Sequence, residues 1–296
     1  MDVGTVAVLG AGTLGAALAR GWVRAGLVRP GALHLTRRHT EDLTPLAVEG
    51  FSTGTDNVEA VRRADVVVVA VRPAQAPPLL ASLRPTLDPT RHIVVSIAAG
   101  LTLDHLRDLV GPTIPVVRAM PNTAIETGDS MTCISVDESS RRALPVAEAL
   151  FDAVGRTRVI DEELMLAATA LCGCGIAFFL RTIRGAAQGG TQIGFSPDDA
   201  LEMAAQTALG AARLALQEGA HPEREIDRVT TPEGCTIAGL NELEHQGFTS
   251  ALIRAMLTSS RRAREMSDEA GGAPTGMSPG AVDFAAAKLA RDERAV

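Results

Sequence analysis

A glycine-rich segment near the start of the chain has the residue types and the spacing that can hold phosphate groups. Residues 10–15 read G-A-G-T-L-G, follow an apolar run at residues 3–9 and open a predicted helix. Gly10 permits a tight turn, Gly12 lets a pyrophosphate approach the backbone, and Gly15 lets the helix pack on the strand. The amide N–H groups at the start of the helix would face the phosphates. The pattern therefore predicts a dinucleotide site.

The end of the second predicted strand indicates which dinucleotide this would be. An NAD site usually has an aspartate or glutamate there, which holds the ribose 2′-hydroxyl. This chain has Thr36, Arg37 and Arg38, and the next carboxylate is Glu41. A guanidinium pairs with a phosphate through two parallel hydrogen bonds. We therefore predict NADP(H) rather than NAD(H), while one arginine of the pair can equally be a solvated loop residue.

The composition limits the remaining chemistry. The 296 residues are 46% hydrophobic and 21% charged, which is typical of soluble globular proteins. The net charge of −7 argues against nucleic acid as a partner, because phosphate backbones attract basic surfaces. The sequence contains no tyrosine, and its single lysine is Lys288. A mechanism that needs a tyrosine, or a lysine in the folded core, is therefore excluded.

The expected location of the chain is the cytoplasm. Its start lacks a basic segment followed by a long apolar stretch, so we expect no signal peptide. The four cysteines form no C-x-x-C pair and have no histidine-rich spacing beside them, which favours free thiols and no metal site. Residues 164–180 carry no charge, but this run is short for a membrane span and contains Gly173 and Gly175. We expect a helix buried in an interface rather than a helix in a membrane.

The order of the predicted elements divides the chain. Apolar, β-branched runs alternate with helical stretches up to residue 160, which is typical of βαβ units around a mostly parallel sheet. Residues 161–270 are rich in Ala, Leu and Glu at helical spacing, and residues 271–296 are predicted to be a mobile tail. The predicted strands are residues 3–9, 33–36, 66–71, 93–97, 116–119, 131–136 and 157–160.

Four separated segments resemble the pyrroline-5-carboxylate reductase family, in the same order along the chain. Residues 64–73 read A-D-V-V-V-V-A-V-R-P, residues 95–100 read V-S-I-A-A-G, and residues 117–123 read V-R-A-M-P-N-T. Residues 229–240 read V-T-T-P-E-G-C-T-I-A-G-L and are similar to the family signature V-T-S-P-G-G-T-T-I-A-G-L. The resemblance covers about residues 3–268, so it is much more specific than the glycine-rich segment alone.

The resemblance implies a fold, a reaction and an assembly. The fold is α/β, with an N-terminal Rossmann-type doubly wound sheet at residues 1–160 and a C-terminal all-helical dimerisation and substrate domain at residues 161–270. The reaction is the NADPH-dependent reduction of the C=N bond of 1-pyrroline-5-carboxylate to L-proline. The assembly is a homodimer formed through the helical domains, and the dimers can join into a larger ring.

The resemblance also assigns candidate roles to single residues. Thr236 would be catalytic and would form a hydrogen bond with the substrate nitrogen, although an ordinary helix cap is an alternative role for it. The turn before Thr236 would offer backbone N–H groups to the substrate carboxylate. The substrate-binding candidates are Thr231, Gly234, Cys235 and Thr236. The cofactor-binding candidates are Gly10, Gly12, Thr13, Leu14, Gly15, Thr36, Arg37, Arg38, Asn57, Ala70, Val71, Arg72, Pro73, Ala98, Ala99, Met120, Pro121 and Asn122.

The chain departs from the family pattern at residues 172–178. The family reads S-G-S-G-P-A-Y there, whereas this chain reads C-G-C-G-I-A-F. One interpretation is that the cysteines are small buried residues in place of serine. The other is a less polar site for a different cyclic imine. The departures are Cys172, Cys174, Ile176 and Phe178.

A further departure lies in the turn before Thr236. The family's P-G-G reads P-E-G at residues 232–234, so a glycine has become Glu233. If this position needs a positive φ, the glutamate costs about 1–2 kcal/mol. Its carboxylate would also place a negative charge near the expected position of the substrate carboxylate.

Two other kinds of protein share this layout. The 3-hydroxyacid and 6-phosphogluconate dehydrogenase families use a lysine in the helical region, and this chain has none there, which excludes them. A non-catalytic NADP-binding relative of a reductase stays open, because the residues at the turn and at residues 172–178 are altered. Turnover of a cyclic imine distinguishes an enzyme from such a relative.

Overall fold

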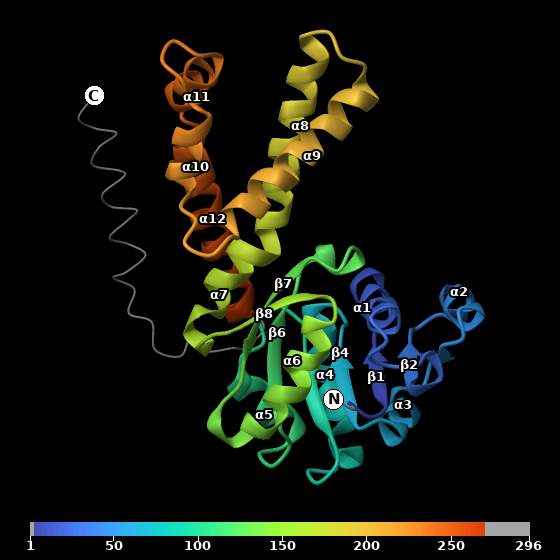
Figure 1. Ribbon diagram of the computed structural model, residues 1–296. Helices are drawn as coiled ribbons and strands as arrows, with labels where there is room; N and C mark the ends of the chain where they lie inside the picture. Colours follow the sequence, from blue (N-terminus) through green and yellow to red (C-terminus); the bar gives the residue numbers. More distant parts are fainter. Residues whose placement is uncertain (1–2, 270–296) are drawn as a thin grey trace. The chain divides into compact units, whose positions relative to one another are not determined.

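The computed structural model describes residues 3–269, so the tail predicted at residues 271–296 lies outside the described residues. The strands are β1 (Val6–Leu9), β2 (Leu33–Thr36), β3 (Ser52–Gly54), β4 (Val66–Val69), β5 (Ile93–Ser96), β6 (Val116–Met120), β7 (Ser130–Ser135) and β8 (Gly155–Val159). They form one sheet in the order β3-β2-β1-β4-β5-β6-β7-β8 (Figure 1). Neighbouring strands are parallel except β6 and β7, which are antiparallel.

Helices cover both faces of this sheet. They are α1 (Thr13–Arg24), α2 (Thr44–Val48), α3 (Asn57–Arg63), α4 (Ala76–Leu83), α5 (Leu103–Val110) and α6 (Leu144–Asp152). Successive strand residues point to opposite faces. Val6 and Val8 therefore join a core with α1 and α6, and Ala7 and Leu9 join a second core with α3, α4 and α5. The predicted doubly wound, Rossmann-type sheet is confirmed.

The lone tryptophan fixes α1 against α6. Trp22 is fully buried, and its indole Nε1 donates a hydrogen bond to the carbonyl oxygen of Leu150 at 2.6 Å. A buried indole with its N–H satisfied contributes apolar area without leaving a polar group unpaired. This contact holds in place the helix whose first turn adjoins the glycine-rich segment.

Two features of the sheet are absent from the sequence prediction. β3 is a three-residue strand on the sheet edge, paired with β2, and its Ser-Thr-Gly composition gives no apolar run. β7 is antiparallel to β6 because the connection between them contains only the 3₁₀ turn Thr123–Glu126. A parallel pair needs a crossover of about a dozen or more residues, which this connection does not provide.

The rest of the described chain is helical. Its elements are α7 (Met165–Ala168), the π-helical turn Thr169–Cys174, α8 (Gly175–Gln192), α9 (Pro197–Ala215), α10 (Pro222–Val229), α11 (Cys235–His245) and α12 (Phe248–Glu269). The chain forms two compact units, one containing Met1–Gly173 together with the end of α12 from Ser260, and the other containing Cys174–Ser259. The helical C-terminal region predicted from the sequence is confirmed.

The second unit leaves most of its large apolar side chains uncovered in a single chain. α8 packs closely on α9, because Gly190 faces Ala200 without a side chain of its own. Phe179 and Leu180 of α8 are nevertheless 55% and 57% exposed. Exposed apolar helix faces of this kind are usually covered by another protein surface.

The helical run Glu162–Gln192 is long and apolar enough to cross a membrane by length and composition alone. Core helices of soluble proteins pass the same test.

Candidate cofactor and substrate sites

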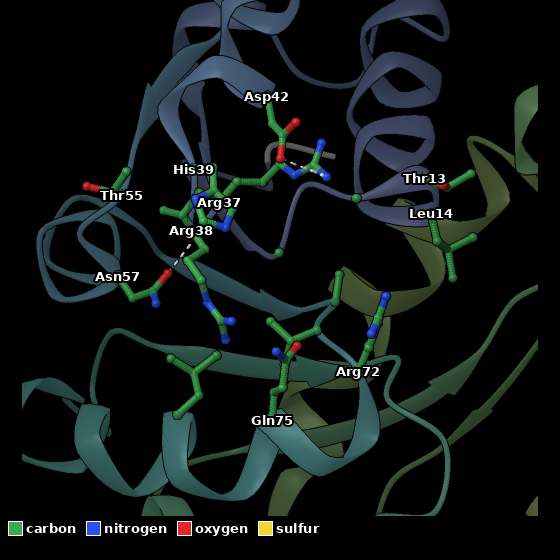
Figure 2. A pocket seen from close by; sticks show the side chains of 16 residues that line it. Thr13, Leu14, Arg37, Arg38, His39, Asp42, Thr55, Asn57, Arg72 and Gln75 are labelled. Atoms are coloured by element: carbon green, nitrogen blue, oxygen red, sulfur yellow. Dashed lines mark hydrogen bonds and ion pairs between the residues drawn. The ribbon is translucent and has the colours of Figure 1, made fainter.

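A cleft of about 770 Å³ opens at the carboxyl ends of β1, β2 and β4. The strand order reverses here, with β2 on one side of β1 and β4 on the other, and open α/β sheets bind ligands at such a point. Figure 2 shows polar side chains from several loops around this space. The lining residues are Gly10, Gly12, Thr13, Leu14, Thr36, Arg37, Arg38, His39, Asp42, Thr55, Asn57, Ala70, Val71, Arg72, Gln75 and Leu79.

The three glycines of the glycine-rich segment occupy different environments. Gly10 has a φ of +98°, and a Cβ there would lie 2.9 Å from the backbone of Ala70. A Cβ on Gly15 would lie 2.5 Å from the carbonyl oxygen of Gly10, so only glycine lets α1 lie this close to β1. Gly12 is the N-cap of α1, and a Cβ there would have no atom within 4 Å. Its missing side chain therefore leaves space beside the free N–H groups of the first helical turn, where a phosphate fits.

The end of β2 carries the two arginines predicted to select the cofactor. Arg37 forms an ion pair with Asp42 at 3.2 Å, while Arg38 extends toward the side of the cleft that carries Gln75 (Figure 2). The hydroxyl of Thr36 donates a hydrogen bond to Oδ1 of Asn57 at 2.6 Å. Asp42 was not among the predicted residues. It follows β2 by six positions, so no fixed spacing identified it as the partner of Arg37.

Several predicted cofactor residues lie outside the cleft lining. Gly15 packs α1 on the sheet, and Pro73 begins a 3₁₀ turn. Ala98 and Ala99 follow β5, and the remaining three residues lie at the end of β6 or directly after it. These three are Met120, Pro121 and Asn122.

Met120 and Asn122 belong to a small cluster at the end of β6. Met120 packs with Cys133, Met165 and Ala168, with Ala99 against them. Asn122 uses its Nδ2 to donate to the carbonyl oxygen of Cys172 at 3.1 Å. Ala99 and Met120 therefore belong to one cluster on the first unit, and neither of them lines the cleft.

The predicted substrate turn precedes α11. Gly234 is the N-cap of α11, and its N–H donates to the carbonyl oxygen of Thr231 at 3.0 Å. A Cβ on Gly234 would lie 2.4 Å from the Thr231 hydroxyl and 3.0 Å from the Thr231 carbonyl oxygen, so a side chain here would have to displace that hydroxyl. Thr236 lies inside the first turn of α11 and is exposed, so the alternative that it caps this helix is wrong. Cys235 is exposed as well.

Glu233 adopts a φ of +57°, so this position does hold a non-glycine residue in the left-handed conformation. We expect Glu233→Gly to raise the melting temperature by about 2 °C. Relief of the left-handed strain is worth about 1–2 kcal/mol, and the extra freedom of glycine in the unfolded chain offsets about 0.4–1 kcal/mol of it. Thermal unfolding followed by circular dichroism measures the net effect.

The control for this variant is Glu223→Gly. Glu223 is an exposed glutamate in the first turn of α10, where the backbone is helical. Glycine in a helix costs up to about 1 kcal/mol, so this control should lower the melting temperature. A melting temperature that falls in both variants would show that Glu233 is not strained.

The four cysteines are free thiols. Cys133 on β7 and Cys172 in the π-helical turn lie together, with 3.9 Å between their Sγ atoms. This juxtaposition was not predicted, because the two residues are far apart in the sequence. Within residues 3–269, no group of three or more His, Cys, Asp or Glu side chains is placed to hold a metal ion.

Two protein-family models match the chain. The model described as pyrroline-5-carboxylate reductase dimerisation matches residues 162–266, which include most of the helical region. The model described as NADP oxidoreductase coenzyme F420-dependent matches residues 5–100, which include the glycine-rich segment and the strands β1 to β5. The first match begins just after the last strand of the sheet, and the second lies entirely within the part of the chain that forms the sheet.

Relatives and solved structures match nearly the whole chain. Pyrroline-5-carboxylate reductase 1 of Dictyostelium discoideum is 46% identical over 88% of this chain and 49% of that protein, so the chain spans about half the length of this relative. Pyrroline-5-carboxylate reductase 2 of the same organism is 43% identical over 87% of this chain and 91% of that protein. The crystal structure of Plasmodium falciparum pyrroline carboxylate reductase with NADP bound has a TM-score of 0.80 and 25% identity, and covers 90% of this chain and 99% of that chain. On sequence and fold together, the chain belongs to the pyrroline-5-carboxylate reductase family.

Proposed function

We propose that the chain reduces the C=N bond of 1-pyrroline-5-carboxylate to give L-proline, with NADPH as the hydride donor. The observation that carries the proposal is the open space at Gly12, beside the first turn of α1. The chain that contains this space is 46% and 43% identical to two pyrroline-5-carboxylate reductases. The cleft has the glycine at the helix start, the arginines and the switch-point position that a phosphorylated dinucleotide needs.

The residues of the first unit bind and orient the cofactor. When bound, the dihydronicotinamide supplies a hydride to an imine that protonation has already made electrophilic. The first turn of α1 receives the pyrophosphate, and Arg37 and Arg38 receive the ribose 2′-phosphate. Ala98, Ala99 and residues 120–122 border the nicotinamide end. Positioning of this kind lowers a barrier by about 7–11 kcal/mol, so the site needs few charged groups.

The residues before and within α11 bind the substrate. The turn at residues 231–234 leads into the first turn of α11, whose N–H groups and positive dipole end attract the substrate carboxylate. The hydroxyl oxygen of Thr236 accepts a hydrogen bond from the protonated imine nitrogen, which holds the proton on that nitrogen. No side chain then has to act as a general acid, in agreement with a chain that lacks tyrosine.

The loss of NADPH absorbance with racemic 1-pyrroline-5-carboxylate and a panel of other cyclic imines tests the proposed reaction. We expect the highest kcat/KM with 1-pyrroline-5-carboxylate. A higher kcat/KM with another imine would instead assign a different substrate, as the departures at Cys172, Cys174, Ile176 and Phe178 suggest. Binding of NADPH without turnover of any imine would identify a non-catalytic relative.

Changing both arginines at the end of β2 tests the choice of NADPH over NADH. We expect Arg37→Ala/Arg38→Ala to lower the ratio of kcat/KM with NADPH to kcat/KM with NADH by about tenfold, roughly 1.4 kcal/mol. The effect is moderate because Arg38 is exposed and Arg37 is already paired with Asp42. Arg141→Ala, an exposed arginine paired with Glu138, serves as the control. An unchanged ratio in the double variant would contradict the assignment.

We further propose a homodimer in the cytoplasm, with assembly of dimers into a ring as the next level. The exposed apolar side chains of α8 and the match to a dimerisation model at residues 162–266 support a second copy as the covering surface. Burial of such faces is the usual driving force for permanent homodimers.

A further inference from the structure

Two cysteines from distant parts of the chain meet on the first unit. Cys133 lies on β7, and Cys172 lies in the π-helical turn that follows α7, with their Sγ atoms 3.9 Å apart. α7 lies beside β7 (Figure 1). Cys133 is 5% exposed, whereas Cys172 is partly exposed, so a reagent from solution reaches Cys172 first.

The surroundings of this pair connect it to the segment proposed to border the nicotinamide. Met120 and Met165 pack around Cys133, and Cys172 packs against the same cluster. The carbonyl oxygen of Cys172 accepts the hydrogen bond from Nδ2 of Asn122 at 3.1 Å. A movement of the π-helical turn therefore changes the contacts of Asn122 directly.

The two thiols differ in acidity. A hydrogen bond from the Cys133 thiol lowers the pKa of Cys172 to about 7, although burial opposes this shift. The same hydrogen bond, followed by burial, raises the pKa of Cys133. The thiolate is the attacking form of cysteine. Cys172 is thus the attacking sulfur and Cys133 the resolving sulfur.

We propose that Cys133 and Cys172 form a reversible disulfide by exchange with a low-molecular-weight disulfide, and that this bond changes the segment at Asn122 that borders the nicotinamide end of the cofactor site. The Cys172 thiolate attacks one sulfur of the small disulfide and displaces one thiolate. Cys133 then loses its proton to solvent and attacks Cys172, which breaks the mixed disulfide and releases the second thiolate. Two protein thiols are oxidised, and one small disulfide is reduced to two thiols.

Closure of the bond requires a movement that the turn can supply. An S–S bond is about 2.05 Å long, so the sulfurs approach by nearly 2 Å. β7 is held by β6 on one side and β8 on the other, while π-helical turns are irregular segments that often lie at functional sites. We therefore expect the turn to move, which alters the hydrogen bond between Nδ2 of Asn122 and the Cys172 carbonyl oxygen. The effect on the reductase rests on the proposed function, whereas bond formation does not.

Thiol counting and peptide mapping test the bond itself. The full chain is incubated with oxidised glutathione, unfolded in the presence of an alkylating reagent and mapped by mass spectrometry. We expect the free thiols to fall from four to two, with one Cys133–Cys172 linkage. Cys133→Ser should instead retain one glutathione on Cys172. Cys174→Ser changes a cysteine in the same turn and should behave like the parent chain. Four remaining thiols, or a linkage to Cys174, would overturn the proposal.

The second measurement compares the reduced and oxidised chains. We expect oxidation to lower NADPH affinity or kcat/KM for the imine about fivefold or more, and dithiothreitol to restore both. Cys172→Ser lacks the attacking sulfur, so its NADPH affinity and kcat/KM should change neither with oxidised glutathione nor with dithiothreitol. Equal NADPH affinity and equal turnover in both forms would overturn the regulatory role. If the reduced chain turns over no imine, the proposed function fails, and NADPH affinity alone decides the effect of the disulfide.

Discussion

Gly12→Val should raise the KM for NADPH about 100-fold, a loss of roughly 2.7 kcal/mol of binding free energy. A valine side chain at Gly12 would extend into open space, since a Cβ there has no atom within 4 Å. That space adjoins the first turn of α1, where the pyrophosphate must approach the backbone. The substitution therefore displaces the ligand rather than any part of the protein. Initial rates at varied NADPH concentration measure the effect.

The fold should be preserved in this variant. Gly12 has a φ of −74° and an extended ψ, which a β-branched residue adopts without strain. We expect the melting temperature to change by only about 2 °C or less. Gly31→Val is the matched control, because Gly31 also has open space around its Cβ position but lies outside the cleft lining. Native NADPH affinity in Gly12→Val, or a comparable loss in Gly31→Val, would contradict the site.

The contrast with Gly15 shows why one motif contains two kinds of glycine. A Cβ on Gly15 would meet the Gly10 carbonyl oxygen at 2.5 Å, so substitution there must move α1 or the turn. Substitution of Gly12 and substitution of Gly15 should both reduce activity, but only the substitution of Gly15 should also lower the melting temperature. The motif predicts that Gly12 leaves space for the ligand and that Gly15 allows the helix to pack on the strand. The distances from the Cβ positions of these two glycines agree with this distinction.

The sequence was sufficient for most of the sheet, because runs such as V-V-V-V in β4 are long, apolar and β-branched. It was insufficient for β3, whose three residues have no such pattern. The direction of β7 had a signal that was missed, because the predicted strands at residues 116–119 and 131–136 leave too short a connection for a parallel pair. The boundary of the helical unit also differs from the change in composition near residue 160. The long helical run Glu162–Gln192 continues across the division at Gly173.

Some residues of the candidate site could be predicted from local sequence patterns, and others could not. Gly10, Gly12 and Arg38 were accessible to sequence reasoning because they keep fixed spacings from a strand end. Asp42 and the pairing of Cys133 with Cys172 were not, because these contacts depend on how separate segments approach each other in three dimensions. Side chains that act through tertiary contacts have no local pattern to identify them.

Thr236→Val should lower kcat/KM for 1-pyrroline-5-carboxylate about 100-fold, roughly 2.7 kcal/mol, and leave the KM for NADPH unchanged. Valine keeps the shape of threonine but removes the hydroxyl oxygen that accepts the hydrogen bond from the substrate N–H. A hydrogen bond to a charged group contributes about 1.5–3 kcal/mol, and a substrate nitrogen left without its acceptor loses most of it. The position tolerates the change, because Thr236 is exposed within α11 and Gly234, not Thr236, caps the helix.

Thr236→Ser is the control that separates the hydroxyl from the shape of the side chain. Serine retains an oxygen that can accept the same bond, so kcat/KM should stay within about fivefold of the parent value. Melting temperatures of both variants should match the parent, because the side chain is exposed and does not contribute to a core. Equal activity in Thr236→Val and the parent chain would remove the hydroxyl from the mechanism. Substrate binding would then rest on the N–H groups at the start of α11, and a fall in Thr236→Ser alone would point to packing at the methyl group instead.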